Sequence, residues 1–264
     1  MRAPVDSHAV ELRPGSARPG ARVLYVDGVA QSYVDLADPT YLHFDYIRWM
    51  ASVVDTAAPR RAPVRALHLG GGGFTLPRYV AATRPGSTQV VVERDAALLD
   101  LVRRELPLPP GDLRVRLADA REAIEAEPAA SYDLVLTDVY QGAQMPAQFA
   151  GVEFAAEVAR VLRPDGLYTV NLTDLPPLGH SRVQAATLRA VFPDVCLIAG
   201  RAMLRGRRYG NIVLAAARKA GRLPVARLTT RALRDPFAGV VLHGTALDRF
   251  VGGARPVDGP GLAS

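Results

Sequence analysis

The sequence is poor in the residues that define several protein classes. It holds a single cysteine, Cys196, so no disulfide framework can form within the chain. The strand-like run around it, residues 195–198, indicates a small buried side chain rather than a nucleophile. No apolar stretch reaches membrane-spanning length, and no charged-then-apolar leader stands at the N-terminus. We therefore expect a cytoplasmic protein that does not insert into membranes.

Lysine is as scarce as cysteine. Lys219 is the only one, so arginine supplies nearly all of the positive charge behind the net charge of +6 and the pI of about 9.8. A basic balance favours nucleic-acid binding. Because alanine, proline and glycine are also abundant, we interpret the arginine content as a compositional bias and do not expect a nucleic-acid partner. The cluster Arg205, Arg207 and Arg208 is interpreted as a solvated loop, with phosphate contact as the alternative.

The hydrophobic content is sufficient for one large core. With 49% hydrophobic residues in 264, one α/β domain with additions fits better than two full domains. The pattern predicts a disordered arm over 1–20, a β-hairpin and a helix over 21–60, a nucleoside-binding domain over 61–218 and a peripheral extension over 219–264. Asp27-Gly28 suits the hairpin turn because both positions tolerate positive φ. Thr40 is expected to cap the following helix, in which Tyr46 and Trp49 lie on the apolar face that packs on the sheet.

The chain is organised around a glycine loop. An apolar run over 64–69 leads into Gly70, Gly71, Gly72 and Gly73 and then into helix-compatible sequence, the pattern that opens a nucleotide-binding βαβ unit. A second apolar run ends at Glu93, some twenty residues later, where a carboxylate can accept hydrogen bonds from both ribose hydroxyls. A tight turn without a ligand, and a solvent-facing Glu93, are the plain alternatives. The combined pattern favours a nucleoside site.

Two further acids follow strands. Asp119 comes after the alternating run 113–117 and forms a capping-box pattern with Glu122, and it can cap a helix and contact adenine at once. Asp138 ends the apolar run 133–138 at the carboxyl edge of the sheet, where open α/β sheets bind ligands. The glycine- and glutamine-containing segment after it has the composition of a mobile loop over an active site.

These residues together resemble the spermidine synthase-like (polyamine aminopropyltransferase) family. The likeness runs through the Asp-Gly-x-x-Gln hairpin that ends at Gln31, the glycine loop, Glu93, Asp119-Ala120, Asp138 and the Arg-Pro-Asp-Gly run at 163–166, about two thirds of the chain. It implies a seven-stranded, mostly parallel Rossmann-like sheet of the class I S-adenosylmethionine methyltransferase type, preceded by the N-terminal β-hairpin. It also implies a homodimer joined through these hairpins.

The resemblance assigns roles to individual residues. Gln31, Gly70, Gly71, Gly72, Glu93, Asp119 and Ala120 would hold the nucleoside of S-adenosylmethionine or its decarboxylated form, with no metal. Asp138 would be the catalytic base that deprotonates an attacking amine, with Tyr140 beside it. Tyr41, His43 and Gln141 are candidates for contact with the small-molecule acceptor. His43 also suits a structural role on its helix.

Two positions depart from the family pattern. The fourth residue of the family's loop is an acid that pairs with the donor's ammonium, and here it is Gly73. A second acid three residues after the strand-end acid is replaced by Gln141. An unpaired ammonium in a dry pocket costs several kcal/mol, on the order of the penalty for any buried unpaired charge. Putrescine is therefore in doubt as acceptor, and intact S-adenosylmethionine becomes a credible donor.

Three functions remain open from sequence. The first is transfer of an alkyl group from a nucleoside sulfonium to an amine or another nucleophile, by aminopropyl, methyl or aminocarboxypropyl transfer. The second is an NAD-dependent oxidoreductase, disfavoured because Thr75 stands at the third glycine position of the dinucleotide fingerprint. The third is a family member that binds nucleoside without catalysis. We expect the first.

Overall fold

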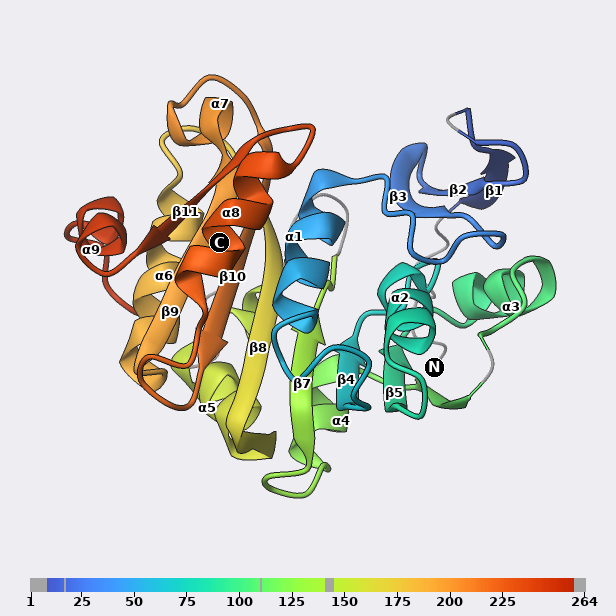
Figure 1. Ribbon diagram of the computed structural model, residues 1–264, viewed down its shortest axis with the longest axis horizontal. Helices are drawn as coiled ribbons and strands as arrows, with labels where there is room; N and C mark the ends of the chain where they lie inside the picture. Colours follow the sequence, from blue (N-terminus) through green and yellow to red (C-terminus); the bar gives the residue numbers. More distant parts are fainter. Residues whose placement is uncertain (1–8, 17, 110, 141–144, 259–264) are drawn as a thin grey trace, which may run out of the picture.

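Strands and helices alternate around one central sheet in the computed structural model, which describes residues 9–16, 18–109, 111–140 and 145–258 (Figure 1). The strands of this sheet are β4 (Arg65–Leu69), β5 (Thr88–Glu93), β6 (Asp112–Leu117), β7 (Tyr132–Thr137), β8 (Leu162–Asp174), β9 (Asp194–Gly200), β10 (Gly210–Ala217) and β11 (Gly239–His243). Within the described residues their order is β11-β9-β10-β8-β7-β4-β5-β6. The predicted Rossmann-like α/β fold is confirmed, but the sheet has eight strands rather than the expected seven.

The strands from β8 to β6 in this order run parallel, because each pair among them is joined by a crossover. The expected antiparallel pair of β9 and β10 is confirmed. The eighth strand, β11, pairs antiparallel with β9 and comes from the segment that we expected to be a peripheral extension. The expectation was wrong because residues 239–243 form too short an apolar run to signal a strand by alternation.

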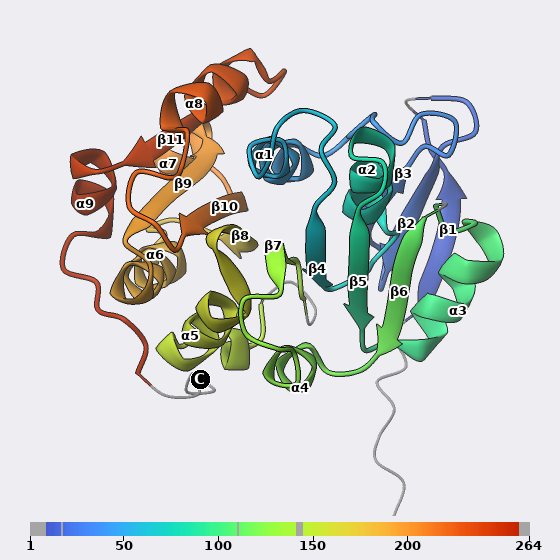
Figure 2. The same cartoon turned by 60° about the horizontal axis from the view of Figure 1, so that its bottom comes forward.

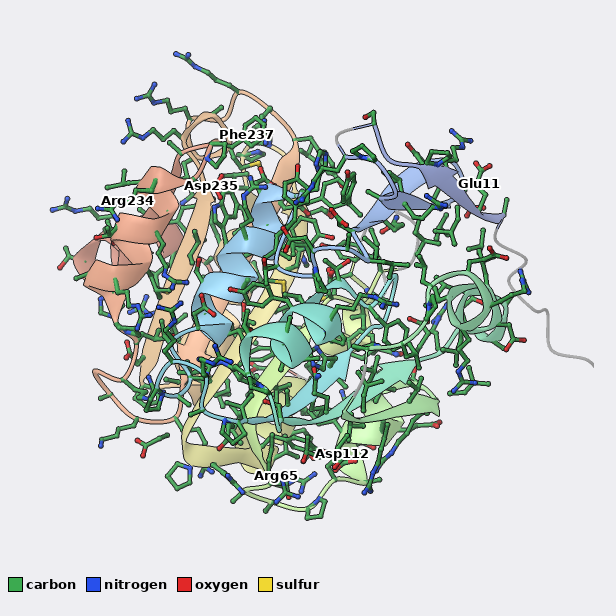
Figure 3. All side chains as sticks on the ribbon, turned by 45° about the vertical axis from the view of Figure 1, so that its right-hand side comes forward. Glu11, Arg65, Asp112, Arg234, Asp235 and Phe237 are labelled. Atoms are coloured by element: carbon green, nitrogen blue, oxygen red, sulfur yellow. The ribbon has the colours of Figure 1, made fainter. Side chains whose placement is uncertain are left out.

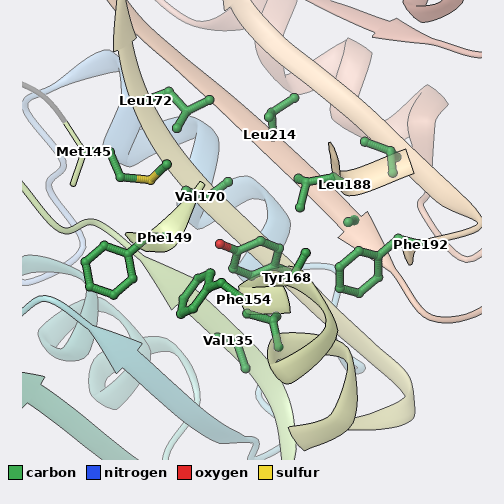
Figure 4. Packing of buried hydrophobic residues seen from close by; sticks show 14 of the residues in the cluster. Val135, Met145, Phe149, Phe154, Tyr168, Val170, Leu172, Leu188, Phe192 and Leu214 are labelled. Atoms are coloured by element: carbon green, nitrogen blue, oxygen red, sulfur yellow. The ribbon is translucent and has the colours of Figure 1, made fainter. Parts of the chain in front are cut away.

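Helices cover both faces of the sheet (Figure 2). One face packs against α1 (Asp45–Val54), α2 (Thr75–Thr83) and α8 (Val225–Arg234). The other packs against α4 (Ala120–Glu125), α5 (Val152–Val161), α6 (Gly179–Val191) and α9 (Thr245–Val251). In that second layer Phe149 of the short helix η1 (Ala147–Phe149) meets Phe154 edge-on at 5.1 Å, and Tyr168 stacks on Phe192 (Figure 4).

A second, smaller sheet stands at the N-terminus. It is antiparallel and consists of β1 (Val10–Pro14), β2 (Arg22–Val26) and β3 (Val29–Val34), packed on the glycine loop and on α3 (Ala96–Glu105). The turn at Asp27-Gly28 has φ of 51° and 76°, as the sequence predicts. The expected two-stranded hairpin is extended by β1, so residues 10–14 are not the disordered arm that we expected. Strand β1 pairs along its full length with β2, which the local sequence does not signal.

Several local expectations can be checked directly. Trp49 and Cys196 are buried in the core, and burial raises the pKa of the Cys196 thiol to about 12. Helix α1 begins after Phe44 rather than at a Thr40 cap, because Thr40 is held in a turn by Asp38.

The labelled charged side chains Glu11, Asp112 and Arg234 point outward at the periphery (Figure 3). None of the helices in the described ranges has the length and hydropathy of a membrane span.

Candidate active site

Four neighbouring strands end together and bring their following residues to one edge. The Asp138 amide donates to the Leu69 carbonyl at 2.9 Å, and the Gly70 amide donates to the Val92 carbonyl at 2.9 Å. The Ala118 amide likewise donates to the Glu93 carbonyl at 3.0 Å. These bonds tie the carboxyl ends of β7, β4, β5 and β6 into one rim. Ligands of open parallel sheets bind at such a rim.

A cavity of about 800 Å³ opens along this rim. Its lining includes every nucleoside-binding and catalytic residue expected from sequence, namely Gln31, Gly70, Gly71, Gly72, Glu93, Asp119, Ala120, Asp138 and Tyr140. The volume lies within the range of small-molecule and cofactor pockets, roughly 300–1,000 Å³. Residues as far apart in sequence as Gln31 and Tyr140 thus share one space.

The Glu93 carboxylate fixes the glycine loop. One of its oxygens accepts the Gly71 amide at 2.9 Å and the Gly72 amide at 3.4 Å, and the other accepts the Asp95 amide at 2.9 Å. Each carboxylate oxygen can accept more than one hydrogen bond. Glu93 can therefore hold the loop and still accept hydroxyl groups of a ligand in the cavity.

Gly70 joins this loop to the strand of Asp138. Its φ is +95°, and a Cβ atom there would lie 2.2 Å from the Asp138 carbonyl oxygen. Only glycine avoids both the backbone strain and the collision. The close approach sets how near the loop lies to the Asp138 strand end.

Gly73 packs against the N-terminal sheet. Its amide donates to the Ser32 hydroxyl at 2.9 Å, and an added Cβ would lie 2.8 Å from the Ser32 Cβ and 2.9 Å from a Val34 methyl. A larger side chain has no room here. The close packing of β3 against Gly73 thus explains why this position does not hold the family's loop acid.

The end of the cavity at β6 is held by Asp119. As expected, Asp119 caps α4, since its carboxylate accepts the Arg121 amide at 2.7 Å. Its other oxygen accepts the Gln148 side-chain amide at 3.1 Å. Ala120 lies beside it, and Phe149 provides an aromatic wall. An apolar wall facing a fixed hydrogen-bonding rim suits a planar base such as adenine.

Asp138 lies in a strongly desolvated position at the rim. Burial raises the pKa of its carboxyl group to about 6, and this shift persists although Asn171 and Tyr46 favour the charged form by donating hydrogen bonds to it. The Asn171 side-chain amide donates at 3.0 Å. A carboxylate with a pKa near the operating pH, held by two donors and facing a cavity, has the properties of a general base.

Tyr140 follows Asp138 at the same rim. Burial and the nearby Asp138 carboxylate raise the pKa of the Tyr140 hydroxyl well above its usual value. The hydroxyl therefore stays protonated at physiological pH and cannot act as a base, and its oxygen is sealed from solvent. Gln141, which is a candidate from sequence for contact with the acceptor, lies outside the described residues.

Tyr41 and His43 are not brought to this cavity. They line a separate hollow of about 500 Å³ together with Arg48, Tyr79 and Phe237. His43 stacks on Tyr33 with ring centroids 4.3 Å apart, and burial lowers its pKa. His43 precedes α1 and does not lie on a helix as expected.

Sequence reasoning missed two partners of Asp138. Tyr46 was expected only as part of the apolar face of its helix. Its hydroxyl lies 3.4 Å from the Gln31 carbonyl oxygen, which is a second possible acceptor for the single hydrogen that it can donate to Asp138. Nothing in its spacing distinguishes it from a core residue. Asn171 did carry a signal, because an amide side chain is unusual in the apolar run of β8 and its side chain is buried.

The chain is similar to several known proteins. No protein-family model matches it. It is 28% identical over 157 residues to the polyamine aminopropyltransferase of Vibrio vulnificus, which covers 58% of this chain and 50% of that protein. It is 34% identical over 148 residues to polyamine aminopropyltransferase 2 of Streptomyces coelicolor, which covers 52% of this chain and 26% of that protein. The match thus spans half or less of these relatives.

The comparison with solved structures covers more of the chain. The crystal structure of a probable spermidine synthase from Corynebacterium glutamicum superposes with a TM-score of 0.88 at 30% identity, over 99% of both chains. The fold and the cavity at its rim define a Rossmann-like protein of the class I methyltransferase type. Within that class, the chain belongs to the spermidine synthase-like (polyamine aminopropyltransferase) family, as its motifs suggested.

Proposed function

We propose that this protein is an alkyltransferase that moves an aminopropyl group from decarboxylated S-adenosylmethionine to an amine, with Asp138 as the base. The observation that carries the proposal is the sharing of one cavity by Glu93, the glycine loop, Asp119 and Asp138. The activities named for the relatives support the same reaction class.

The proposed reaction requires an uncharged amine as the nucleophile. In the proposed step the amine lone pair forms a bond to the propyl carbon, and the carbon–sulfur bond breaks with its electron pair going to sulfur. The proton released from nitrogen passes to the Asp138 carboxylate. A base whose pKa is about 6 accepts this proton more readily than an ordinary aspartate. Tyr46 and Asn171 keep the accepting oxygens oriented.

The donor would lie along the rim. Asp119, Ala120 and Phe149 face the adenine in this arrangement, and Glu93 accepts the ribose hydroxyls. Gly70 to Gly72 offer a surface without side chains to the sulfur. Gln31 lies over the nucleoside, with its backbone carbonyl tied to Tyr46. Tyr140 lines the cavity beside the acceptor.

Methyl transfer from intact S-adenosylmethionine is the second candidate. The observation in its favour is Gly73, where a neutral, tightly packed residue offers no carboxylate to the donor's ammonium. The two donors differ in the group transferred, so the product mass separates the candidates.

The test is an assay with purified protein, each donor in turn and a panel of primary amines that includes putrescine. We expect methylthioadenosine and an aminopropylated amine from the decarboxylated donor. A mass increase of one methyl group with intact S-adenosylmethionine would instead establish the second candidate. Failure of both donors to bind, by thermal-shift titration, would overturn the nucleoside site itself.

Other aspects of this enzyme stay predictions. We place it in the cytoplasm, acting without a metal, and as a homodimer joined through the N-terminal sheet. Sedimentation of the wild-type chain and of a variant with a charge on the exposed face of β1 would test the last point.

A further inference from the structure

Part of the cavity wall has no role in the proposed chemistry. Ile47 of α1, Leu76 of α2 and Leu136 of β7 line this part, which we call the inner branch, and they pack on the same face of the sheet. His68 also lines the cavity and is only 2% exposed. It stands next to Leu136 across the β4–β7 ladder. A buried imidazole in an apolar branch calls for an explanation.

The position of His68 relative to the base follows from the register. His68 pairs with Leu136, and Asp138 comes two residues later on β7. Since successive side chains of a strand alternate, Asp138 and Leu136 project to the same face, with Asp138 about 7 Å nearer the rim. His68 therefore lies deeper in the branch at whose entrance Asp138 stands.

The tautomer of His68 is dictated by its partners. The Gln89 side-chain amide nitrogen donates to the Pro77 carbonyl at 3.1 Å, so the Gln89 oxygen faces the imidazole. His68 Nε2 lies 2.9 Å from that oxygen and must therefore carry the hydrogen. Nδ1 is left as a bare acceptor. Burial lowers the pKa of His68 to about 4, which keeps the ring neutral at physiological pH.

Nδ1 is open to the cavity. No described residue donates a hydrogen bond to it, and it is not among the polar atoms sealed away from solvent. Because so little of His68 is exposed, the space that Nδ1 reaches is the cavity that the residue lines. A hydrogen-bond acceptor thus points from a fixed ring into an otherwise apolar branch.

We propose that His68 is a donor-selectivity residue, whose Nδ1 accepts a hydrogen bond from the amino group on the tail of the sulfonium donor. The inference rests on the proposed function. With the nucleoside along Glu93 and Asp119 and the sulfur near the glycine loop, the tail beyond the sulfur enters the branch below Asp138. The Asp138 carboxylate, which lines the same cavity, supplies an opposite charge.

The same geometry discriminates against a carboxylate on the tail. A carboxylate oxygen would meet either the Nδ1 lone pair or the apolar side chains of Ile47 and Leu76, and neither can replace its hydration. His68 therefore favours the decarboxylated donor over intact S-adenosylmethionine. This selectivity does not need the family's acidic loop residue, for which the packing around Gly73 leaves no room.

The first test uses the wild-type protein with 15N-labelled histidine. The nitrogen shifts should show the Nε2–H tautomer with a bare Nδ1 in the free protein. Decarboxylated S-adenosylmethionine should move the Nδ1 resonance toward the hydrogen-bonded position, whereas methylthioadenosine, which lacks the tail amine, should leave it in place. A Nδ1–H tautomer, or equal shifts with both ligands, would contradict the proposal.

The second test compares variants by their affinity for three nucleosides. The double variant His68→Leu/Gln89→Leu removes both polar partners together, so that neither is left unpaired in the core. We expect its Kd for decarboxylated S-adenosylmethionine to rise about 10-fold, while its Kd for methylthioadenosine stays within about 2-fold. The preference for the decarboxylated donor over the intact one should shrink accordingly. Thr169→Val, a buried polar-to-apolar change at a residue that does not line the cavity, is the matched control.

The outcomes separate this inference from the proposed function. If the double variant loses affinity equally for methylthioadenosine and for the decarboxylated donor, His68 and Gln89 have a structural role. His68 then does not bind the amino group of the donor's tail. If its affinities all match wild type, the inference also fails while the transferase proposal stands. If the wild-type protein binds no nucleoside, both fall together.

Discussion

The two halves of the cavity are built differently. The nucleoside half, as we call the part proposed to bind the nucleoside, uses residues at strand ends, Glu93 and Asp119, and each is fixed by backbone amides nearby in the sequence. The reaction half is assembled from distant elements, since Asp138 takes its partners from α1 and from β8. Binding therefore depends on local motifs, and reactivity depends on the packing of the whole sheet. Variants in the two halves should separate affinity from turnover.

The largest effect is expected from the base. Asp138→Asn should lower kcat by about 10²–10⁴-fold, the range for loss of a general base, while donor affinity stays near wild type. Steady-state kinetics and calorimetric titration measure the two quantities. Asp112→Asn, which changes an exposed acid on the edge strand, is the control. Near-wild-type turnover by the Asp138 variant would remove the base from the mechanism.

The same variant has a stability signature. The folded-state pKa of Asp138, about 6, lies above its ordinary value of 3.8, so the folded protein holds this proton more tightly than the unfolded chain does. The charged carboxylate therefore costs stability above pH 6 and not below pH 3.8. Asp138→Asn should raise Tm at pH 8 by roughly 2–6 °C and leave it unchanged at pH 4 or below. An equal change at both pH values would point to lost packing instead.

The next largest effect is expected in the nucleoside half. Glu93→Ala removes the acceptor of the Gly71 amide as well as the ribose contact, so donor affinity should fall roughly 10–100-fold. Glu105→Ala, on the exposed side of α3, should leave affinity unchanged. The readout is the Kd for methylthioadenosine. A change in kcat at saturating donor with the Kd unaltered would place Glu93 in the reaction half.

Gly70→Ala should affect both halves at once. Its Cβ would collide with the Asp138 carbonyl oxygen, and the residue would keep a positive φ. We expect a loss of several °C in Tm together with weaker donor binding, because the loop must move away from β7. Gly179→Ala, where an added Cβ meets nothing within 4 Å, is the matched control. Retention of wild-type Tm and affinity would show that the loop tolerates this shift.

The pH dependence should be smaller but diagnostic. Since the base must be unprotonated, kcat/KM should rise with pH through a midpoint near 6. Asn171→Leu removes a donor to the charged carboxylate and should move the midpoint upward by about one unit. A pH profile of both proteins tests this. A downward shift would assign the midpoint to another group.

The smallest effect is expected for the residues outside the cavity. Tyr41→Phe and His43→Ala change a separate hollow, so kcat and KM should stay within about 2-fold of wild type. Both variants need a Tm measurement, because His43 packs on Tyr33. A marked rise in the acceptor KM without loss of Tm would return these residues to the substrate site.

The contrast between the halves also explains what sequence could predict. Glu93 and Asp119 each follow a strand-like run, and the motif that marks each of them lies within about thirty residues of sequence. Their positions could therefore be predicted without knowing how the chain packs. Asp138 was found for the same reason, but Tyr46 was not, because a tyrosine on an apolar helix face has the same pattern in the core and at a site. Tyr41 and His43 were placed by similarity of position alone, and the chain before α1 turns them away.

The predicted number of strands was wrong for a comparable physical reason. The five-residue strands at the margins, β1 and β11, are too short to be recognised from sequence alone, although residues 10–13 alternate between apolar and polar. Both depend on the partner that they pair with. The parallel strands in the middle are buried on both faces and show as continuous apolar runs. The centre of the sheet was therefore predictable from sequence and its borders were not.

The contact between Gly73 and β3 restricts the order in which substitutions can accumulate in this lineage. A single change from Gly73 to aspartate would drive the new side chain into Ser32 and Val34, which leave no room for its first carbon. Smaller residues on β3, or a displaced N-terminal sheet, would have to come first. A laboratory search for variants with an acidic loop should therefore recover paired changes at positions 32 or 34, and not the loop substitution alone.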